Sequence, residues 1–342
     1  MLGQRLPAEW EPQDAILLLW PHKGVDGMQL TIVQLYEALV SVICDYTDVV
    51  IALSKTEIDN VRFRLEAMSI PLEHVYFYPV SYGDALSNLW ARDCGPIAIE
   101  SEQGLKLLSF TLNGCGEKVD ANNVFKQLRL QNAFPAVCYE DQNWSLEAGV
   151  IGTDGQGTLL AKESYFLSKE SSSNLSKDEI ESRLKNAFGV SNILWLVSGS
   201  MCENCHYIDQ LVRFCPNNTI VYTACDEEQD KYYKGLKKME IELSFMKNAA
   251  GEPYRLLPLP WPGAMFNDED ERLQVSYASF LIVNEAVLVP IYNALSDEDA
   301  LEVVFQAFPG FDIMGIPSET LVEQGGSLHR IAMQLPEGAL GF

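Results

Sequence analysis

The chain is short of positive charge. Its 342 residues hold 24 Lys and Arg against 48 Asp and Glu, which gives a formal net charge of −24 at pH 7. A surface of this sign repels the phosphates of nucleic acids and the headgroups of anionic lipids, so neither is an expected partner. It attracts small cations, although an acidic surface can also serve solubility alone.

Long apolar runs are missing as well. No stretch reaches the roughly 18–20 apolar residues that a membrane-spanning helix requires. The run AILLLW near the N-terminus is too short, and lies too far along the chain, for the core of a secretory signal. We therefore expect a cytoplasmic protein.

The chain also lacks the cysteine density of a disulfide-stapled scaffold and the sequence pattern of a phosphate-binding loop. Eight cysteines in a chain of this length are too sparse for a disulfide-stapled scaffold, and those inside apolar runs are expected to be buried thiols. The stretch GTDGQGT (152–158) lacks the lysine and the spacing of a phosphate-binding loop, and is better explained as a turn between strands. No G-x-S-x-G nucleophile elbow occurs. No cofactor is expected.

Strand-like and helix-like segments alternate from end to end. Runs rich in β-branched and aromatic residues predict strands, and apolar residues three and four apart predict helices, one of them with Ser176 as N-cap. No linker divides the chain, and the polar stretch 168–179 is interpreted as a surface loop, so we expect one α/β domain over residues 1–342. The predicted strands are 48–53, 74–80, 105–112, 192–197, 219–224 and 279–290, and the predicted helices are 30–45, 56–68, 178–188, 229–247 and 297–308.

One short motif has several interpretations. Cys202-x-x-Cys205-His206 has the spacing of c-type haem attachment, of a redox pair or of half a zinc site. Haem attachment needs export and an axial ligand, and neither is indicated. The three side chains can share one tetrahedral ion, but apart from His329 no candidate fourth ligand stands out. A metal or redox site is kept as an alternative to two incidental cysteines.

Four segments concentrate polar and aromatic side chains that packing does not require. They are NLWARDCGPI (88–97), SLEAGVIGTDGQGT (145–158), SGSMCENCHYIDQLVRF (198–214) and EQGGSLHRIAMQLP (323–336). Together with RLPAEWEPQDAILLLWPH and SYASFLIVNEAVLVP, and in this order from residue 5 to residue 336, they resemble the landmarks of the agmatine deiminase family. That family includes the bacterial, Porphyromonas-type peptidyl-arginine deiminases.

The resemblance implies a fold and a chemistry. The family has the pentein fold, a five-bladed, pseudo-symmetric α/β propeller of ββαβ units around a polar site. Its members hydrolyse a guanidinium group to a ureido group and release ammonia. Carboxylates hold the planar cation, a His moves protons, and a Cys thiolate attacks the guanidinium carbon. The implied ligand is agmatine or an arginine side chain, and association into oligomers is compatible with the resemblance.

The carboxylates of the implied site are retained. Asp93 falls on the aspartate of the family's W-x-R-D-x-G-P segment, Glu147 on the glutamate of E-G-G, and Asp209 on the aspartate of G-H-x-D. Trp90 is expected to form a wall of the pocket. The resemblance thus predicts a substrate-binding set of Trp90, Asp93, Glu147 and Asp209.

The reacting groups of the family are not retained. Tyr207 stands where the family has its His, and His206 stands where it has Gly. If this segment is a strand, neighbouring side chains face opposite sides, so His206 does not simply replace the lost His. Arg330 stands at the nucleophilic Cys, and a protonated guanidinium cannot attack another one. Cys94, which follows Asp93 in the sequence, is only a weak substitute for the missing nucleophile, since its family counterpart is a small turn residue.

We therefore expect a deiminase-family protein without the family's hydrolytic activity. The alternatives are a non-catalytic protein that binds a cationic ligand or regulates a partner, the metal or redox site described above, and an enzyme in which Cys94, Cys202 or Cys205 attacks. If Asp93 and Asp209 face the pocket, the Arg330 guanidinium is expected beside them, in the place of the substrate. The opposite expectation is that Arg330 turns to solvent.

Overall fold

The computed structural model describes residues 3–21, 29–81, 90–111, 122–135, 137–168, 175–201 and 207–341. The chain divides into two compact units, each assembled from three separate segments. Unit 1 contains Met1–Trp10, Ile99–Glu102 and Ala148–Leu328, and unit 2 contains Glu11–Ala98, Gln103–Glu147 and His329–Phe342. The expectation of a single domain stays a prediction.

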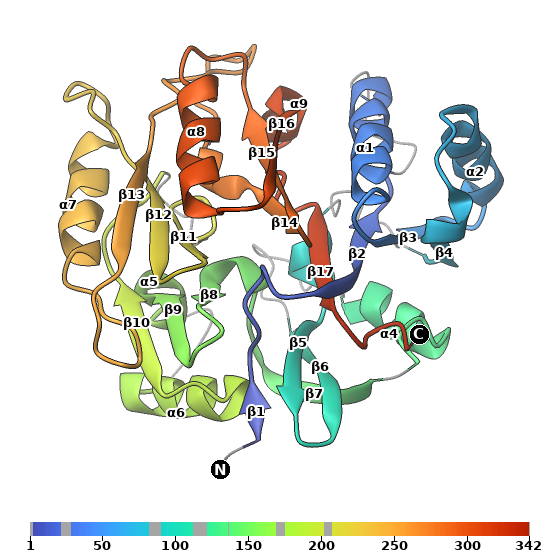
Figure 1. Cartoon of the computed structure of the whole chain (residues 1–342), viewed down its shortest axis with the longest axis horizontal. Helices are drawn as coiled ribbons and strands as arrows, with labels where there is room; N and C mark the ends of the chain where they lie inside the picture. The colour runs from blue at the N-terminus through green and yellow to red at the C-terminus, as the bar shows by residue number, and fades with distance from the viewer. Residues whose placement is uncertain are drawn as a thin grey trace. The chain divides into compact units, whose positions relative to one another are not determined.

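Among its described residues, unit 1 repeats one strand plan three times (Figure 1). In each repeat, the first two strands pair antiparallel, a helical segment follows the second strand, and the third strand then pairs parallel with the second. This is the ββαβ arrangement that the resemblance implies. The repeats are β8 (Ile151–Thr153), β9 (Thr158–Lys162), α5 (Glu163–Phe166), α6 (Lys177–Phe188) and β10 (Asn192–Leu196); β11 (Val212–Cys215), β12 (Thr219–Thr223), α7 (Tyr233–Leu243) and β13 (Arg255–Leu259); and β14 (Leu281–Val283), β15 (Ala286–Ile291), α8 (Asp297–Ala307) and β16 (Asp312–Pro317).

Helix α6 shows how the sequence sets a local boundary. The Ser176 hydroxyl accepts a hydrogen bond from the Glu179 amide, and the Glu179 carboxylate accepts one from the Ser176 amide. This capping box satisfies two amide groups that the first turn of a helix leaves without partners, and it confirms Ser176 as the N-cap. The face toward the core carries Ile180, Leu184 and Phe188, spaced four apart.

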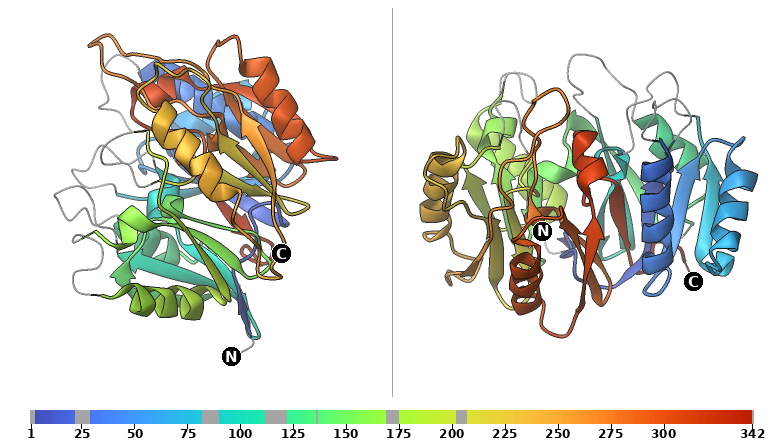
Figure 2. Two further views of the ribbon diagram at one scale, coloured as in Figure 1. Left: turned by 90° about the vertical axis from the view of Figure 1, so that its left-hand side faces the viewer. Right: turned by 90° about the horizontal axis from the view of Figure 1, so that it is seen from above.

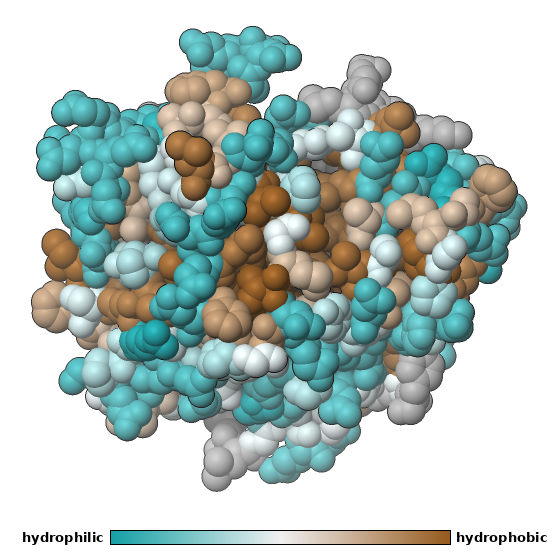
Figure 3. Space-filling model, turned by 45° about the horizontal axis from the view of Figure 1, so that its top comes forward, coloured by the Kyte–Doolittle hydropathy of each residue, from teal (hydrophilic) through white to brown (hydrophobic). Residues whose placement is uncertain are grey.

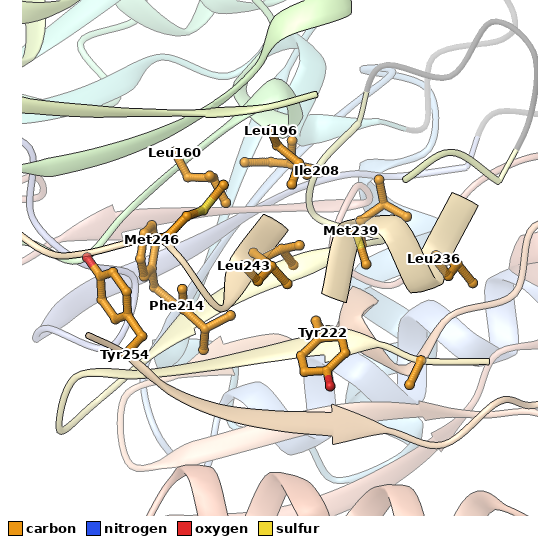
Figure 4. Packing of buried hydrophobic residues seen from close by; sticks show 14 of the residues in the cluster. Leu160, Leu196, Ile208, Phe214, Tyr222, Leu236, Met239, Leu243, Met246 and Tyr254 are labelled. Atoms are coloured by element: carbon orange, nitrogen blue, oxygen red, sulfur yellow. The ribbon is translucent and has the colours of Figure 1, made fainter. Parts of the chain in front are cut away.

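A hydrophobic core lies between α7 and the strands of unit 1 (Figure 4). Met239 and Leu243 of α7 are almost fully buried, and the side chains of β11 and β12 meet them. Ile208 belongs to the same core and is 1% exposed. Packing therefore anchors the segment that carries Tyr207 and Asp209, one on each side of Ile208.

Unit 2 contains the same strand plan, split between the two ends of the chain. Strand β17 (Ala332–Pro336) pairs antiparallel with β2 (Gln13–Leu19), and β3 (Asp48–Leu53) and β4 (Val75–Pro79) continue the sheet in parallel. Figure 2 shows helices α1 (Gln29–Ile43) and α2 (Ile58–Ala67) beside the strands that they connect. The C-terminal strand β17 thus completes a sheet with β2, from the N-terminal part of the chain.

The remaining strands form a further sheet, and the remaining helices are short. In unit 2, β6 (Gly104–Thr111) pairs parallel with β7 (Cys138–Ser145) after helix α4 (Asn122–Leu130). In unit 1, β1 (Gln4–Arg5) pairs antiparallel with the end of β5 (Ile97–Ser101). The other short helices are η1 (Leu72–His74), α3 (Ala91–Cys94), η2 (Ala148–Val150), η3 (Tyr277–Ser279) and α9 (Glu319–Glu323).

Most predicted elements are confirmed, with differences that have local causes. The segment 279–290 forms two strands, because Asn284 adopts a left-handed conformation (φ 45°) in the turn between β14 and β15. The helix predicted over 229–247 is shorter, since the Asp230 carboxylate accepts a bond from the Tyr232 amide in a turn that precedes α7. GTDGQGT is the predicted turn between β8 and β9. Of the predicted surface loop 168–179, residues 169–174 lie outside the described part.

The surface is largely polar, as the composition indicates. Figure 3 shows hydrophilic side chains over much of the displayed face, with hydrophobic patches between them. Within the described ranges, no helix combines the length and the apolar character that crossing a membrane requires.

Candidate functional site

Three of the predicted site residues meet in unit 2. Nη2 of Arg330 lies 2.5 Å from Oδ2 of Asp93, and the guanidinium carbon of Arg330 lies 5.0 Å from the centre of the Trp90 ring. The Arg330 and Asp93 side chains are only 10% and 13% exposed. A buried carboxylate and an aromatic face therefore hold a guanidinium group that the chain itself supplies.

Arg92 positions this cluster. Its Nε donates to the carbonyl oxygen of His329 at 2.9 Å, its Nη2 donates to Oε1 of Gln334, and its backbone amide donates to the carbonyl oxygen of Arg330 at 3.1 Å. These bonds join α3 to the segment that leads into β17. The sequence predicts no role for Arg92, because its acceptors are more than 200 residues away in the chain.

Gly95 allows the close approach of α3 and β17. A Cβ atom at this position would lie 2.8 Å from the carbonyl oxygen of Ala91 and 2.8 Å from Cγ of Met333. Both distances are shorter than any real Cβ contact, so a larger residue would push α3 away from β17. The glycine of the Cys-Gly-Pro sequence therefore has a packing role.

A second cluster, in unit 1, contains Tyr207 and Asp209. A Cβ atom on Gly149 would lie 2.8 Å from Cδ1 of Tyr207 and 3.1 Å from Oδ2 of Asp209, so both side chains lie against this glycine. The Ile208 amide donates to the carbonyl oxygen of Gly149 at 2.8 Å. Asp209 is buried and Tyr207 half-buried.

The segment around Tyr207 is not a strand, contrary to expectation. Residues 207–211 form a bend and a turn, and β11 begins only at Val212. Tyr207 and Asp209 face the same glycine because Ile208 points into the core between them. Strand alternation therefore does not explain the place of His206, which itself lies outside the described residues.

The predicted site residues are divided between the two units. Trp90, Asp93, Glu147 and Arg330 belong to unit 2, whereas Tyr207 and Asp209 belong to unit 1. Glu147 is half-buried and lies between the end of β7 and the start of η2. Within unit 2, the structure brings together Trp90, Asp93 and Arg330.

Three of the described cysteine side chains are poor nucleophiles because burial keeps their thiols protonated. Burial raises the pKa of the Cys44 and Cys215 thiols to about 12, and it also raises the pKa of the Cys225 thiol. A thiol attacks as the thiolate, so these three are almost entirely inactive near neutral pH. Cys138 is exposed on β7. Cys94 ends α3, but its side chain lies outside the described part of the structure.

The candidate metal site also lies outside the described residues. Cys202, Cys205 and His206 are not among them. In the part of the chain that the structure does describe, no three His, Cys, Asp or Glu side chains are grouped as a metal site would require. The metal or redox alternative stays a prediction.

Two buried cations of unit 1 hold segments near Asp209. Arg213 donates to the carbonyl oxygens of Ala278 and Phe280 at 3.0 and 2.8 Å and to the Glu9 carboxylate at 2.5 Å, and so joins three of the landmark segments. Lys162 donates to the carbonyl oxygens of Ser198 and Gly199 at 2.8 and 2.6 Å. The sequence predicts neither role, since all the acceptors lie far along the chain and all but the Glu9 carboxylate are backbone atoms.

Comparison with known proteins decides the family. Residues 5–336 match the model of the Porphyromonas-type peptidyl-arginine deiminase family. The chain belongs to this family. It is 26% identical to the agmatine deiminase of Pseudomonas syringae pv. tomato, over 98% of this chain and 96% of that protein.

Solved structures agree with this assignment. The structure of C. jejuni agmatine deiminase is 30% identical and has a TM-score of 0.85, over 98% of this chain and 97% of that one. A cysteine-to-serine variant of the same protein with substrate bound is 29% identical, also with a TM-score of 0.85 and the same coverage of both chains. The deiminase family that the sequence resembles is thereby confirmed.

Proposed function

We propose that this chain is a member of the deiminase family that does not hydrolyse guanidino compounds. The observation that carries the proposal is the buried Arg330, which stands at the family's nucleophile position with its guanidinium on Asp93. A guanidinium stays protonated in proteins and has no acceptor atom, so it cannot form the covalent amidino intermediate. Tyr207 stands at the position of the family's His, and a phenol, which ordinarily titrates near pH 10, suits proton transfer at neutral pH less well than an imidazole.

Most cysteines whose side chains are described offer no replacement for the nucleophile, and the exposed Cys138 lies outside the landmark segments that resemble the family. Three of them, Cys44, Cys215 and Cys225, have raised pKa values because of burial. The enzymatic alternative therefore depends on Cys94, Cys202 or Cys205. Thiol-blocking reagents test that alternative directly, because they would abolish any hydrolysis that these residues support.

A second candidate function is the binding of a small guanidino compound without turnover. Asp93, Glu147 and Asp209 match the carboxylates of the family's pocket, and they suit a planar cation. A cysteine-to-serine variant of the C. jejuni relative has been solved with substrate bound. The loss of a cysteine is thus compatible with ligand binding in this family, but in this chain a guanidino ligand would have to displace Arg330 from Asp93.

We extend the proposal to the fold and its location. The strand plan occurs three times in unit 1, a fourth time in β17, β2, α1 and β3, and a fifth time in β5, β6, α4 and β7, which supports a five-bladed propeller of ββαβ units in one domain. The cytoplasmic location expected from the sequence is part of this proposal.

The test is ammonia release from agmatine and from an arginine-containing peptide. The unmodified protein is expected to release none above the buffer rate. Arg330→Cys restores a thiol, and the double variant Arg330→Cys/Tyr207→His restores both family groups. If any variant is active, the double variant is expected to exceed the single one. Thiol-sensitive release by the unmodified protein would overturn the proposal.

A further inference from the structure

We propose that Arg330 is an internal ligand: its guanidinium fills a subsite formed by Trp90 and Asp93 and excludes monosubstituted guanidines from the native protein. This inference rests on the proposed function in one respect, because both place the degenerate site at Arg330. It goes further, since it states what occupies the site and which compounds would enter if the occupant were removed.

The contacts of Arg330 are those that a free guanidine would make. A guanidinium needs a carboxylate oxygen along its N–H direction and gains further from an aromatic face within about 6 Å. Arg330 has Asp93 at 2.5 Å and the Trp90 ring at 5.0 Å. An added guanidine and the Arg330 side chain would therefore compete for the same two partners.

Burial explains why Arg330 stays in place. The Asp93 side chain is only 13% exposed, and leaving such a carboxylate without a cation is costly. An internal cation also has a high effective concentration, because the chain holds it next to its acceptor. A small guanidine in solution must therefore displace a partner that is always present.

The backbone at residue 330 does not depend on the Arg330 side chain. Arg92 holds the carbonyl oxygens of His329 and Arg330 and the side chain of Gln334. Arg330→Ala is thus expected to leave the segment in position and to create a space between Trp90 and Asp93. We expect that space to match a monosubstituted guanidinium in size, with the Asp93 carboxylate to balance its charge.

A second Arg–Asp pair provides a matched control. Arg272 pairs with the buried Asp230, and its guanidinium carbon lies 4.5 Å from the Tyr232 ring and 5.7 Å from the Trp261 ring. Asp230 also accepts a 2.8 Å bond from the Tyr232 amide, which remains when Arg272 is removed. The Arg272 pair joins a hairpin to the turn before α7, so without it these two segments are expected to move apart and the space is not held open, whereas Arg92 holds the segments around residue 330.

The experiment measures the thermal unfolding midpoint with and without methylguanidine at millimolar concentration. The proteins are the full chain, Arg330→Ala, Arg272→Ala and Arg330→Ala/Asp93→Asn. At about ten times its Kd, methylguanidine is expected to raise the midpoint of Arg330→Ala by about 3 °C. Little or no shift is expected for the other three proteins. Methylamine, which has the charge but not the planar fork, is expected to stabilise Arg330→Ala less.

Two results would overturn the inference. One is an equal shift for the full chain and Arg330→Ala, which would mean that Arg330 excludes nothing. The other is an equal shift for Arg330→Ala and Arg272→Ala, which would mean that guanidines refill any vacated arginine site.

A separate measurement keeps the inference testable if Arg330→Ala does not fold. Methylguanidine is titrated into the full chain while tryptophan fluorescence is recorded. Absence of saturable binding at millimolar concentration supports the internal ligand, and saturable binding in this range contradicts it. Ammonia is assayed with agmatine in parallel, so hydrolysis by the full chain would refute the proposed function separately from the methylguanidine result.

Discussion

Among the described residues, each unit contains a buried Arg–Asp pair beside an indole ring. Arg272 and Asp230 form the pair in unit 1, and Arg330 and Asp93 form the pair in unit 2. Both arginines have side chains that are 10% exposed, so burial does not separate them. The two pairs differ in which other interactions hold the neighbouring chain segments in place.

Local structure accounts for the pair in unit 1. Arg272 lies in a hairpin in which the Leu273 amide donates to the carbonyl oxygen of Met265, and Asp230 lies in the turn before α7. The ion pair joins the hairpin to this turn. Near Arg330 it is Arg92 that joins two segments, α3 and the segment before β17. The Arg–Asp pair of unit 1 thus joins two chain segments, whereas in the pair of unit 2 the arginine takes the place of a ligand.

The largest effect is expected for Arg272→Ala. Asp230 is 2% exposed, and removing the cation from a buried pair typically costs about 3–5 kcal/mol of the free energy of unfolding. Chemical denaturation of the variant and of the unmodified protein measures the difference. A loss below about 1 kcal/mol would show that the pair is not a clamp.

A smaller effect is expected for Arg330→Ala. Asp93 is 13% exposed, so water compensates it in part, and we expect a loss of about 1–3 kcal/mol. Methylguanidine is expected to recover part of this loss in denaturation experiments, in contrast to Arg272→Ala. If both variants lost the same free energy of unfolding and methylguanidine restored neither, the two pairs would be equivalent and the proposed difference between them would be wrong.

Arg92→Met tests which arginine positions the segment before β17. Loss of the charged donor to the His329 carbonyl and the Gln334 side chain is expected to cost about 1–3 kcal/mol. In the background of Arg330→Ala, it is also expected to abolish recovery by methylguanidine, since α3 is then released. Undiminished recovery would show that Arg92 does not position Asp93.

Lys162 is a further buried cation; Arg272 and Arg330 pair with a carboxylate, whereas Lys162 donates its hydrogen bonds to backbone carbonyl oxygens. Burial lowers the pKa of its ammonium from 10.5 to about 8. Between these values the unfolded chain binds more protons than the folded one, so stability rises with pH. Relative to Lys162→Met, the unmodified protein is expected to gain about 1 kcal/mol between pH 8 and pH 9. A pH-independent difference would contradict the lowered pKa.

The sequence predicts much of the fold because the longer elements carry local signals. Helix α6 has its capping box and its spacing of apolar residues, and β3, β10 and β12 have β-branched runs. The predictions gave no range for β1, β2, β5, β7, β8, β9, β11, β13, β16 or β17, nor for the helices α3, α4, α5 and α9. In β2, for example, the run AILLLW fits a strand or a helix equally well. The pairing of β17 with β2 joins the two ends of the chain, and no local pattern reveals it.

The site follows from the sequence only through the family resemblance. Asp93 and Arg330 are 237 residues apart, and nothing in either segment alone indicates that they touch. The matched motifs led us to expect the carboxylate beside Arg330, which the structure shows within unit 2. Arg92, Arg213 and Lys162 were missed because most of their acceptors are backbone carbonyls, which no sequence pattern marks. The two side-chain acceptors, Gln334 and Glu9, lie 242 and 204 residues away from their arginines.

The most direct test of the central claim is ammonia release from agmatine by the unmodified protein, with an arginine-containing peptide as second substrate. An active agmatine deiminase of the family serves as the positive control. If Arg330 has taken the place of the nucleophile, release stays at the buffer rate at every pH tested. Release above that rate that a thiol-blocking reagent abolishes would show that a cysteine still attacks, and would contradict the account.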